Sequence, residues 1–141
     1  MAYDNDNIFA KILRGEAPAH KVYEDDHTVA FMDVMPQADG HTLVLPKTPA
    51  VNIYELDPAA LDPLMRTVQK VARGVQRAFE ADGIRISQLN GPAAGQSVFH
   101  LHVHVIPCTE GKPRTPHATT MADNDVLAEH AARLKAVLAA Q

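Results

Sequence analysis

The sequence contains no tryptophan, a single cysteine and few aromatic residues, which make up 5% of the chain. The lone Cys108 excludes an internal disulfide and a zinc knuckle built on paired Cys-x-x-Cys ligands. No apolar run approaches the roughly 20 residues that cross a membrane, and the acidic start MAYDNDN is unlike a signal peptide. We therefore expect a cytoplasmic protein that makes no membrane contact.

Basic residues are in the minority, with 13 lysines and arginines against 17 aspartates and glutamates. They are scattered along the chain rather than clustered, so nucleic acid is not an expected partner. The 141 residues, 46% of them hydrophobic, are enough for one soluble domain with a substantial core. We expect a single domain over residues 1–141.

The hydrophobic periodicity predicts three helices separated by short strands. Helical patterns cover Ile8 to Leu13, about Asp57 to Ala81, and a last segment that starts at Asp123 or Asp125. Strand patterns cover Lys21–Glu24, Thr28–Asp33, His41–Pro46, Ile84–Asn90 and a final histidine-containing stretch. Sequential strands with one long helix and no alternation of strand and helix indicate an α+β fold with a five-stranded antiparallel sheet.

Three histidines alternate with apolar residues in the stretch from His100 to Val105. On a strand, alternate residues share a face, so all three imidazoles would project to one side and the apolar residues would pack under a helix on the other. The preceding loop, Asn90 to Ser97, is rich in glycine and can turn backbone N–H groups toward an anion. Imidazoles beside a phosphate-binding loop suggest chemistry at phosphorus.

Three interpretations of the histidines remain open. Neighbours two apart on a strand lie roughly 6.6–6.8 Å apart, so two could share a metal ion, with a third ligand such as His41. A purely structural role would need three sets of buried partners. We favour nucleophilic catalysis, because a neutral imidazole attacks without an activating base. The remaining histidines are expected at the surface: His20, His27, His117 and His130.

The run from His100 to Ile106 resembles the His-φ-His-φ-His-φ-φ signature of the histidine triad (HIT) family, and Ala94 to Phe99 resembles the approach to it. The likeness extends to segments of the N-terminal half: Ile8 to Ile12, Ala30 to Asp33, Pro36-Gln37 and Gly40 to Lys47. The C-terminal segment from about Gly111 is not covered. The resemblance implies a HIT-like fold of the Hint-like branch, a homodimer whose two sheets join into one of ten strands, and a purine nucleotide as the ligand, with neither cofactor nor metal.

The resemblance also implies roles for individual residues. His102 would be the nucleophile, and His41 and His100 would orient the other histidines. His104 and Ser97 would contact the phosphate or assist the leaving group. Asp33 would accept hydrogen bonds from the ribose. The implied phosphate-binding set is Asn90, Gly95, Gln96 and Ser97, and the implied base pocket is Ile8, Phe9, Ile12, Phe31 and Val34, which the residue pattern alone would assign to ordinary core.

Two departures from the family concern the phosphate and leaving-group sides. Leu89 stands where many members carry an amide, so either Asn90 or, after a shift in register, Gln88 would face the phosphate. The tryptophan-bearing tail of the eukaryotic Hint-type members has no counterpart. The expected activity is hydrolysis of purine nucleoside 5′-phosphoramidates at the α-phosphate through a nucleotidyl-histidine. The alternatives are a Fhit-type dinucleoside polyphosphate hydrolase and a nucleotide-binding interaction module with residual activity.

Overall fold

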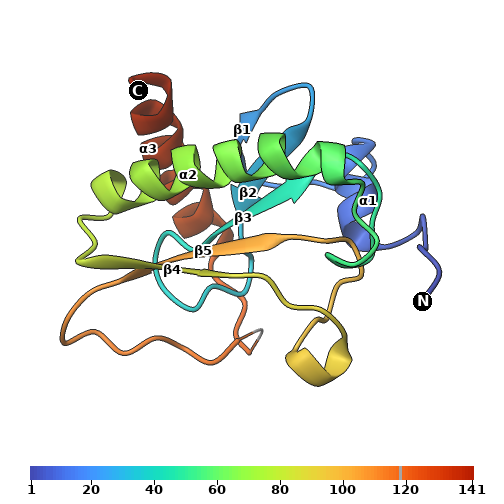
Figure 1. The fold of residues 1–141 in the computed structure, drawn as a ribbon. Coiled ribbons are helices and arrows are strands. Elements are labelled where there is room, and N and C mark those ends of the chain that lie inside the picture. The colour runs from blue at the N-terminus through green and yellow to red at the C-terminus, as the bar shows by residue number, and fades with distance from the viewer. Residues whose placement is uncertain (118) are drawn as a thin grey trace.

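The computed structural model describes residues 1–117 and 119–141, which form a five-stranded antiparallel sheet flanked by helices (Figure 1). The strands are β1 (Lys21–Glu24), β2 (Thr28–Met32), β3 (Thr42–Pro46), β4 (Gly83–Ser87) and β5 (Val103–Cys108). The α-helices are α1 (Ile8–Leu13), α2 (Leu61–Ala78) and α3 (Asn124–Ala139). The sheet order β1-β2-β3-β5-β4 leaves β1 and β4 at the edges. The expected α+β fold is confirmed.

Local sequence signals account for the helix boundaries. The side chain of Asn7 accepts a hydrogen bond from the backbone N–H of Ala10 and caps α1, and Asp123 caps α3 in the same way. The predicted long helix from Asp57 is divided. Asp57 caps a short 3₁₀ turn, η1 (Pro58–Ala60), and α2 begins only at Leu61. In the described part of the chain, none of the helices has the length and apolar character needed to cross a membrane.

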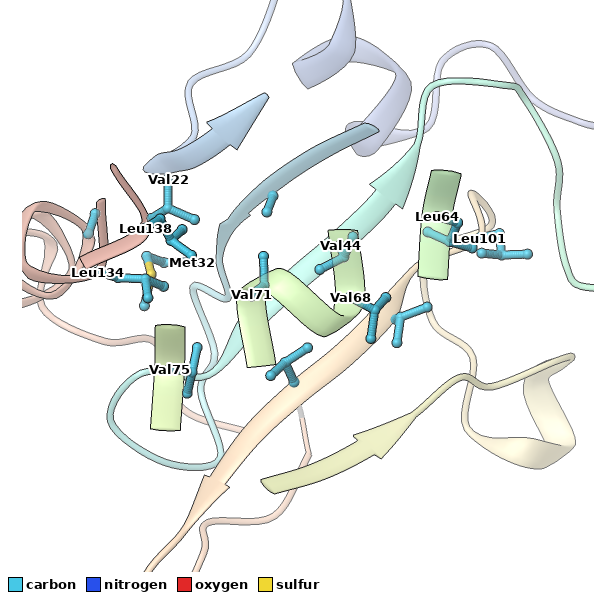
Figure 2. Close-up of a cluster of buried hydrophobic side chains, with 14 of the residues drawn as sticks. Val22, Met32, Val44, Leu64, Val68, Val71, Val75, Leu101, Leu134 and Leu138 are labelled. Atoms are coloured by element: carbon cyan, nitrogen blue, oxygen red, sulfur yellow. The ribbon is translucent and has the colours of Figure 1, made fainter. Parts of the chain in front are cut away.

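One face of the sheet packs against α2 and α3. Figure 2 shows the stripe Leu64, Val68, Val71 and Val75 of α2 against the strands, with Leu134 and Leu138 of α3 beside it. The buried strand partners alternate along the chain, as period-two patterning requires: Val22, Ala30, Met32, Val44, Leu101, Val103 and Val105. The apolar residues between the histidines therefore pack under a helix, as the sequence predicts.

The opposite face of the sheet carries a second, smaller apolar cluster beneath α1. Phe9 and Ile12 of this helix contact strand residues on that side: Val29, Phe31, Leu43 and Leu45. This face also receives His104, the strand neighbour of Leu43. The sheet thus separates a core that stabilises the fold from a face that is available for a site.

The last strand begins later than the alternation of histidines predicts. β5 starts at Val103, so His100 precedes the strand by three residues. The reason is long-range pairing, because the backbone N–H of Leu101 donates to the carbonyl of Ala50, in the loop after β3, rather than to a neighbouring strand. The expectation that all three histidines share one strand is therefore wrong.

After β5 the chain crosses the loop between β2 and β3 before it enters α3, as the orange trace in Figure 1 shows. The backbone N–H of Thr115 donates to the carbonyl of Gln37 at 2.8 Å. The backbone N–H of Ala122 donates to the carbonyl of Val34 at 2.9 Å. We call residues 111–117 and 119–122 the crossing segment; its two hydrogen bonds hold it over the loop that follows β2.

Candidate active site

A pocket of about 460 Å³ opens on the α1 face of the sheet. Its volume lies in the range of roughly 300–1,000 Å³ that is usual for small-molecule sites. Its lining combines an apolar end with polar groups: Ile8, Phe9, Ile12, Pro18, Ala19, Phe31, Met32, Asp33, Val34, Met35, Leu43, Ser97, Val98, His102, His104 and His117. The structure therefore brings together the predicted base-pocket residues, the predicted ribose ligand and two of the three triad histidines.

His102 presents an unprotonated ring nitrogen to this pocket. Its Nδ1 lies 2.7 Å from the carbonyl oxygen of His100, which can only accept a hydrogen bond, so Nδ1 carries the proton. Burial lowers the pKa of His102 to about 4, which keeps the ring neutral at pH 7. The lone pair is therefore on Nε2. The ring edge of Phe9, with its centroid 4.9 Å away, packs against the imidazole and helps to fix its orientation.

The tautomer of His104 is set by a chain of hydrogen bonds that starts at the backbone. The N–H of Gln37 donates to Nδ1 of His41 at 3.0 Å, so His41 carries its proton on Nε2. That nitrogen lies 2.9 Å from Nδ1 of His104 and donates to it. The proton of His104 is consequently on Nε2. Burial brings the pKa of both rings down to about 3, so each is neutral.

The Nε2–H of His104 is a buried donor for which the residues described provide no acceptor. The ring of His102 lies beside it, with a centroid separation of 5.0 Å. A buried polar group without a partner costs free energy, typically about 1–3 kcal/mol. Such a group next to a free imidazole lone pair points to a ligand oxygen as its missing acceptor.

Asp33 directly follows β2 and lines the pocket beside His41. One carboxylate oxygen accepts from the backbone N–H of Met35 at 2.8 Å, and the other lies 3.3 Å from Nε2 of His41. Burial raises the pKa of Asp33. Because His41 is neutral, this contact is not an ion pair, and the carboxylate keeps free acceptor capacity toward the pocket.

Asp33, His41 and His104 each place one potential ligand atom within 4.8 Å of the others, which is close enough for a metal ion. The hydrogen bonds argue against that use. A ligating histidine normally donates from its second ring nitrogen. In His41 the second nitrogen instead accepts from the backbone of Gln37, so the nitrogen facing the cluster carries a proton. The arrangement is that of a hydrogen-bonded relay.

His100 lies outside the pocket lining. Its Nε2–H donates to the carbonyl of Pro46 at 2.8 Å, and its Nδ1 accepts from the hydroxyl of Tyr3 at 2.6 Å. Burial lowers its pKa. The three rings therefore do not form one row, and His100 acts on the site through its backbone carbonyl. Sequence reasoning missed Tyr3, because nothing near it in the chain signals a contact with residue 100.

The predicted phosphate loop divides into a supporting part and a lining part. The side chain of Gln96 accepts from the N–H of Gly91 at 2.8 Å and donates to the carbonyl of Val51 at 2.6 Å. Asn90 accepts from the N–H of Ile53 at 2.8 Å and pairs with the side chain of Gln88. Asn90, Gly95 and Gln96 do not line the pocket, whereas Ser97 does. The side chains of Asn90 and Gln96 shape the loop that presents Ser97.

Two histidines expected at the surface lie elsewhere. His130 of α3 is buried, with its ring 5.2 Å from that of Phe79. His117, on the crossing segment, is half-buried and lines the pocket with its ring 5.2 Å from that of His104. No pattern in the sequence predicts either position, because both depend on where the C-terminal third of the chain returns.

Comparison with known proteins identifies the relatives of this chain. The HIT domain family matches residues 14–111. The protein Hit of Bacillus subtilis is 46% identical over 100 residues, which cover 71% of this chain and 69% of that protein. The adenylylsulfatase HINT3 of Arabidopsis thaliana is 37% identical over 106 residues, 75% of this chain but 54%, about half, of the plant protein.

The fold is also that of solved relatives. The crystal structure of a Hit-like protein involved in cell-cycle regulation from Bartonella henselae superposes with a TM-score of 0.90 at 47% identity. The match covers 96% of this chain and 99% of that one, so it includes the C-terminal part that lies beyond the family match. On the strength of the family match, the sequence identities and the shared fold, this chain belongs to the HIT family.

Proposed function

We propose that the protein hydrolyses purine nucleoside 5′-phosphoramidates at the α-phosphorus, with His102 as the nucleophile. The observation that carries the proposal is the pair of neighbouring ring nitrogens in one pocket. Nε2 of His102 offers a lone pair, and Nε2–H of His104 is a donor that lacks an acceptor in the described part of the chain. A phosphoryl group supplies both an electrophilic phosphorus and an oxygen acceptor.

The first step follows from these positions. Nε2 of His102 attacks the phosphorus, the bond between phosphorus and the amine nitrogen breaks, and a nucleotidyl-histidine forms. The N–H of His104 donates to a phosphoryl oxygen as its negative charge builds up. The modified ring of His102 becomes positively charged, and its Nδ1–H strengthens its hydrogen bond to the carbonyl of His100. Water then attacks the phosphorus and releases the nucleoside monophosphate.

The rest of the pocket fits a nucleoside. Ile8 and Val34 are half-exposed apolar residues at its mouth, 48% and 43% accessible, and can cover the two faces of a flat base. Phe9 and Phe31 close the apolar end with their rings edge to face at 5.4 Å. Asp33, which lines the pocket beside His41, would bind the ribose hydroxyls. These roles for the lining residues are part of the proposal.

The decisive experiment uses the variant His102→Asn. It should lose turnover of an adenosine phosphoramidate while it still binds AMP, because the base and ribose contacts remain. Wild-type protein that is quenched during turnover should carry a nucleotidyl group on residue 102, which peptide mass spectrometry locates. His27→Asn, an exposed position outside the pocket, is the matched control. Near-full turnover in His102→Asn, or an adduct on another histidine, would reject the proposal.

Other leaving groups on the same phosphorus define the alternatives. A dinucleoside polyphosphate hydrolase would release a nucleotide instead of an amine, and the name of the plant relative indicates sulfate as a third leaving group. Initial rates on a phosphoramidate, a diadenosine polyphosphate and adenosine 5′-phosphosulfate, compared as kcat/KM, distinguish these activities. AMP binding without turnover of any of the three would favour an interaction module instead.

We also propose that the protein is a homodimer joined through β4. This edge strand exposes Ile86, which is 48% accessible. Exposed apolar side chains also occur in the loop that is bonded to Asn90 after β4 and at the start of α2: Ile53, Tyr54, Leu61 and Met65 are 37%, 80%, 40% and 52% accessible. Antiparallel pairing of two copies of β4 would cover this surface and form a ten-stranded sheet. Sedimentation velocity should show a dimer in the wild type and a monomer in Ile86→Glu. A monomeric wild type would contradict the proposal.

A further inference from the structure

The proposed function leaves one requirement unmet, which is a proton for the departing amine. An alkylamine leaves phosphorus far more readily as the neutral amine than as its anion, so its nitrogen must be protonated as the bond breaks. His102 cannot supply this proton, because its Nε2 is the nucleophile and its Nδ1–H is held by the carbonyl of His100. The donor must be another group that faces the pocket.

His104 is poorly suited to deliver a proton. It is neutral, and if it gave up its Nε2 proton it would need a replacement from His41 through Nδ1. Beyond His41 the chain reaches the backbone N–H of Gln37, which does not ionise, and the carboxylate of Asp33, which lies 3.3 Å from Nε2 of His41. These buried rings can therefore donate hydrogen bonds to a phosphoryl oxygen, but a transferred proton could be restored only through Asp33, the group assigned to the ribose.

His117 has the access to solvent that the relay lacks. It is half-buried at the pocket wall, with its ring edge-on to that of His104 at a centroid distance of 5.2 Å and an interplanar angle of 80°. Its Nδ1 lies 3.5 Å from the side-chain amide of Gln37. An imidazole at this position can donate a proton to a ligand in the pocket or accept one from it.

The crossing segment holds His117 in place from both sides. Two residues before it, the backbone N–H of Thr115 donates to the carbonyl of Gln37, and the Thr115 hydroxyl lies 3.2 Å from the carbonyls of Pro36 and Gln37. Five residues after it, Ala122 is bonded to Val34. Both anchors are on the loop that follows β2 and carries Asp33, so the imidazole is positioned relative to the rest of the site.

We propose that His117 is a further catalytic residue, which protonates the leaving amine and then deprotonates the attacking water. This role rests on the proposed function. In the first step the His102–phosphorus bond forms, and the phosphorus–nitrogen bond breaks with its electron pair going to nitrogen. Protonated His117 transfers its proton to that nitrogen, and a neutral amine departs.

The second step reverses the role of the imidazole. Water attacks phosphorus, its proton passes to neutral His117, and the His102–phosphorus bond breaks with its electron pair returning to Nε2. The protonated ring is thereby restored, and the sum is phosphoramidate plus water giving nucleoside monophosphate plus amine. The titratable groups that face His117 are Asp33 and His41 on the β2–β3 side, and His102 and His104 at β5.

The test compares two substrates that share a nucleotide and differ in their need for a proton. One is the phosphoramidate of AMP with an alkylamine, and the other is the p-nitrophenyl ester of AMP, whose nitrophenolate leaves as an anion. His117→Gln should lower kcat for the phosphoramidate by about 10²–10⁴-fold, the usual contribution of a general acid. Nucleotidylation by the nitrophenyl ester, measured as the pre-steady-state burst of nitrophenolate, should be unchanged, and this also shows that the variant is folded.

Two results would overturn the assignment in different ways. Equal losses on both substrates would make His117 a binding or structural residue, and no loss on either would leave it without a role. His27→Gln is the matched control and should behave as the wild type on both substrates, since residue 27 is exposed outside the pocket. If the wild type cleaves neither substrate, the proposed function itself fails. If the wild type is active and His117→Gln is equally active, only the role of His117 fails.

Discussion

Acid should unfold this protein at an unusually mild pH, because several buried histidines are neutral in the folded state. Burial places the pKa of His41, His102 and His104 at about 3, 4 and 3, against 6.5 in an unfolded chain. A folded pKa below the unfolded one means that the unfolded chain binds more protons between these values. Stability is therefore complete above about pH 6.5 and is lost as the pH falls toward 4.

The magnitude follows from the unfolded pKa alone, because at pH 5 the folded rings are still neutral. Each histidine then favours the unfolded chain by about 1.4 kcal/mol for every pH unit below 6.5, or about 2 kcal/mol at pH 5. Three such groups remove about 6 kcal/mol, which is comparable with the whole stability of an ordinary domain, about 5–15 kcal/mol. Asp33, whose pKa burial raises, acts in the opposite direction and offsets only part of this loss.

The assay is urea unfolding followed by far-ultraviolet circular dichroism at pH 7 and pH 5, at one protein concentration. His104→Asn should reduce the loss between the two pH values by about a third, because one of the three titrating groups is removed. His27→Asn, at an exposed position, should leave the loss as it is in the wild type. A wild-type loss below about 2 kcal/mol would refute the reasoning, since it would mean that the rings accept protons in the folded state.

Three further predictions concern single residues. Gly40 has a φ of +96°, and a Cβ added there would lie 2.6 Å from the ring of Phe79. Gly40→Ala should therefore lower the free energy of unfolding, measured in urea, by about 2–5 kcal/mol. Gly15→Ala, at φ +78° with open space around the added Cβ, should cost only about 1 kcal/mol; equal losses would contradict the packing argument. Tyr3→Phe should lose about 1–3 kcal/mol by leaving Nδ1 of His100 without its donor, whereas Tyr54→Phe, 80% exposed, should lose nothing. Asp33→Asn should lower kcat/KM about 10- to 100-fold for an adenosine phosphoramidate, and not for its 2′,3′-dideoxy analogue, if the carboxylate binds the ribose.

Local pattern accounts for most of the architecture. The stripe on α2 and the period-two alternation on β2, β3 and β5 decide which side chains face the large core, and both are visible in the sequence. The caps at Asn7 and Asp123 mark two helix starts equally well. These features could be predicted because each depends on residues a few positions apart.

The features that sequence reasoning missed all depend on contacts between distant segments. His100 leaves the strand because the neighbouring Leu101 bonds to the carbonyl of Ala50. Tyr3 reaches His100 across 97 residues of sequence, and His117 reaches the pocket only because the crossing segment returns over the loop that follows β2. Alternation predicted three equivalent rings, whereas the fold gives each a separate partner. A periodic signal cannot carry that information.

The N–H of His104 that has no acceptor in the described chain makes occupancy of the pocket measurable without any knowledge of the reaction. An oxyanion that reaches this nitrogen relieves part of a desolvation penalty of about 1–3 kcal/mol. By mass action, whatever binds the folded form raises the melting temperature. Thermal melts across a panel of nucleotides, nucleosides and simple oxyanions would therefore rank ligands by affinity, and that ranking could direct the choice of substrates before any product is sought.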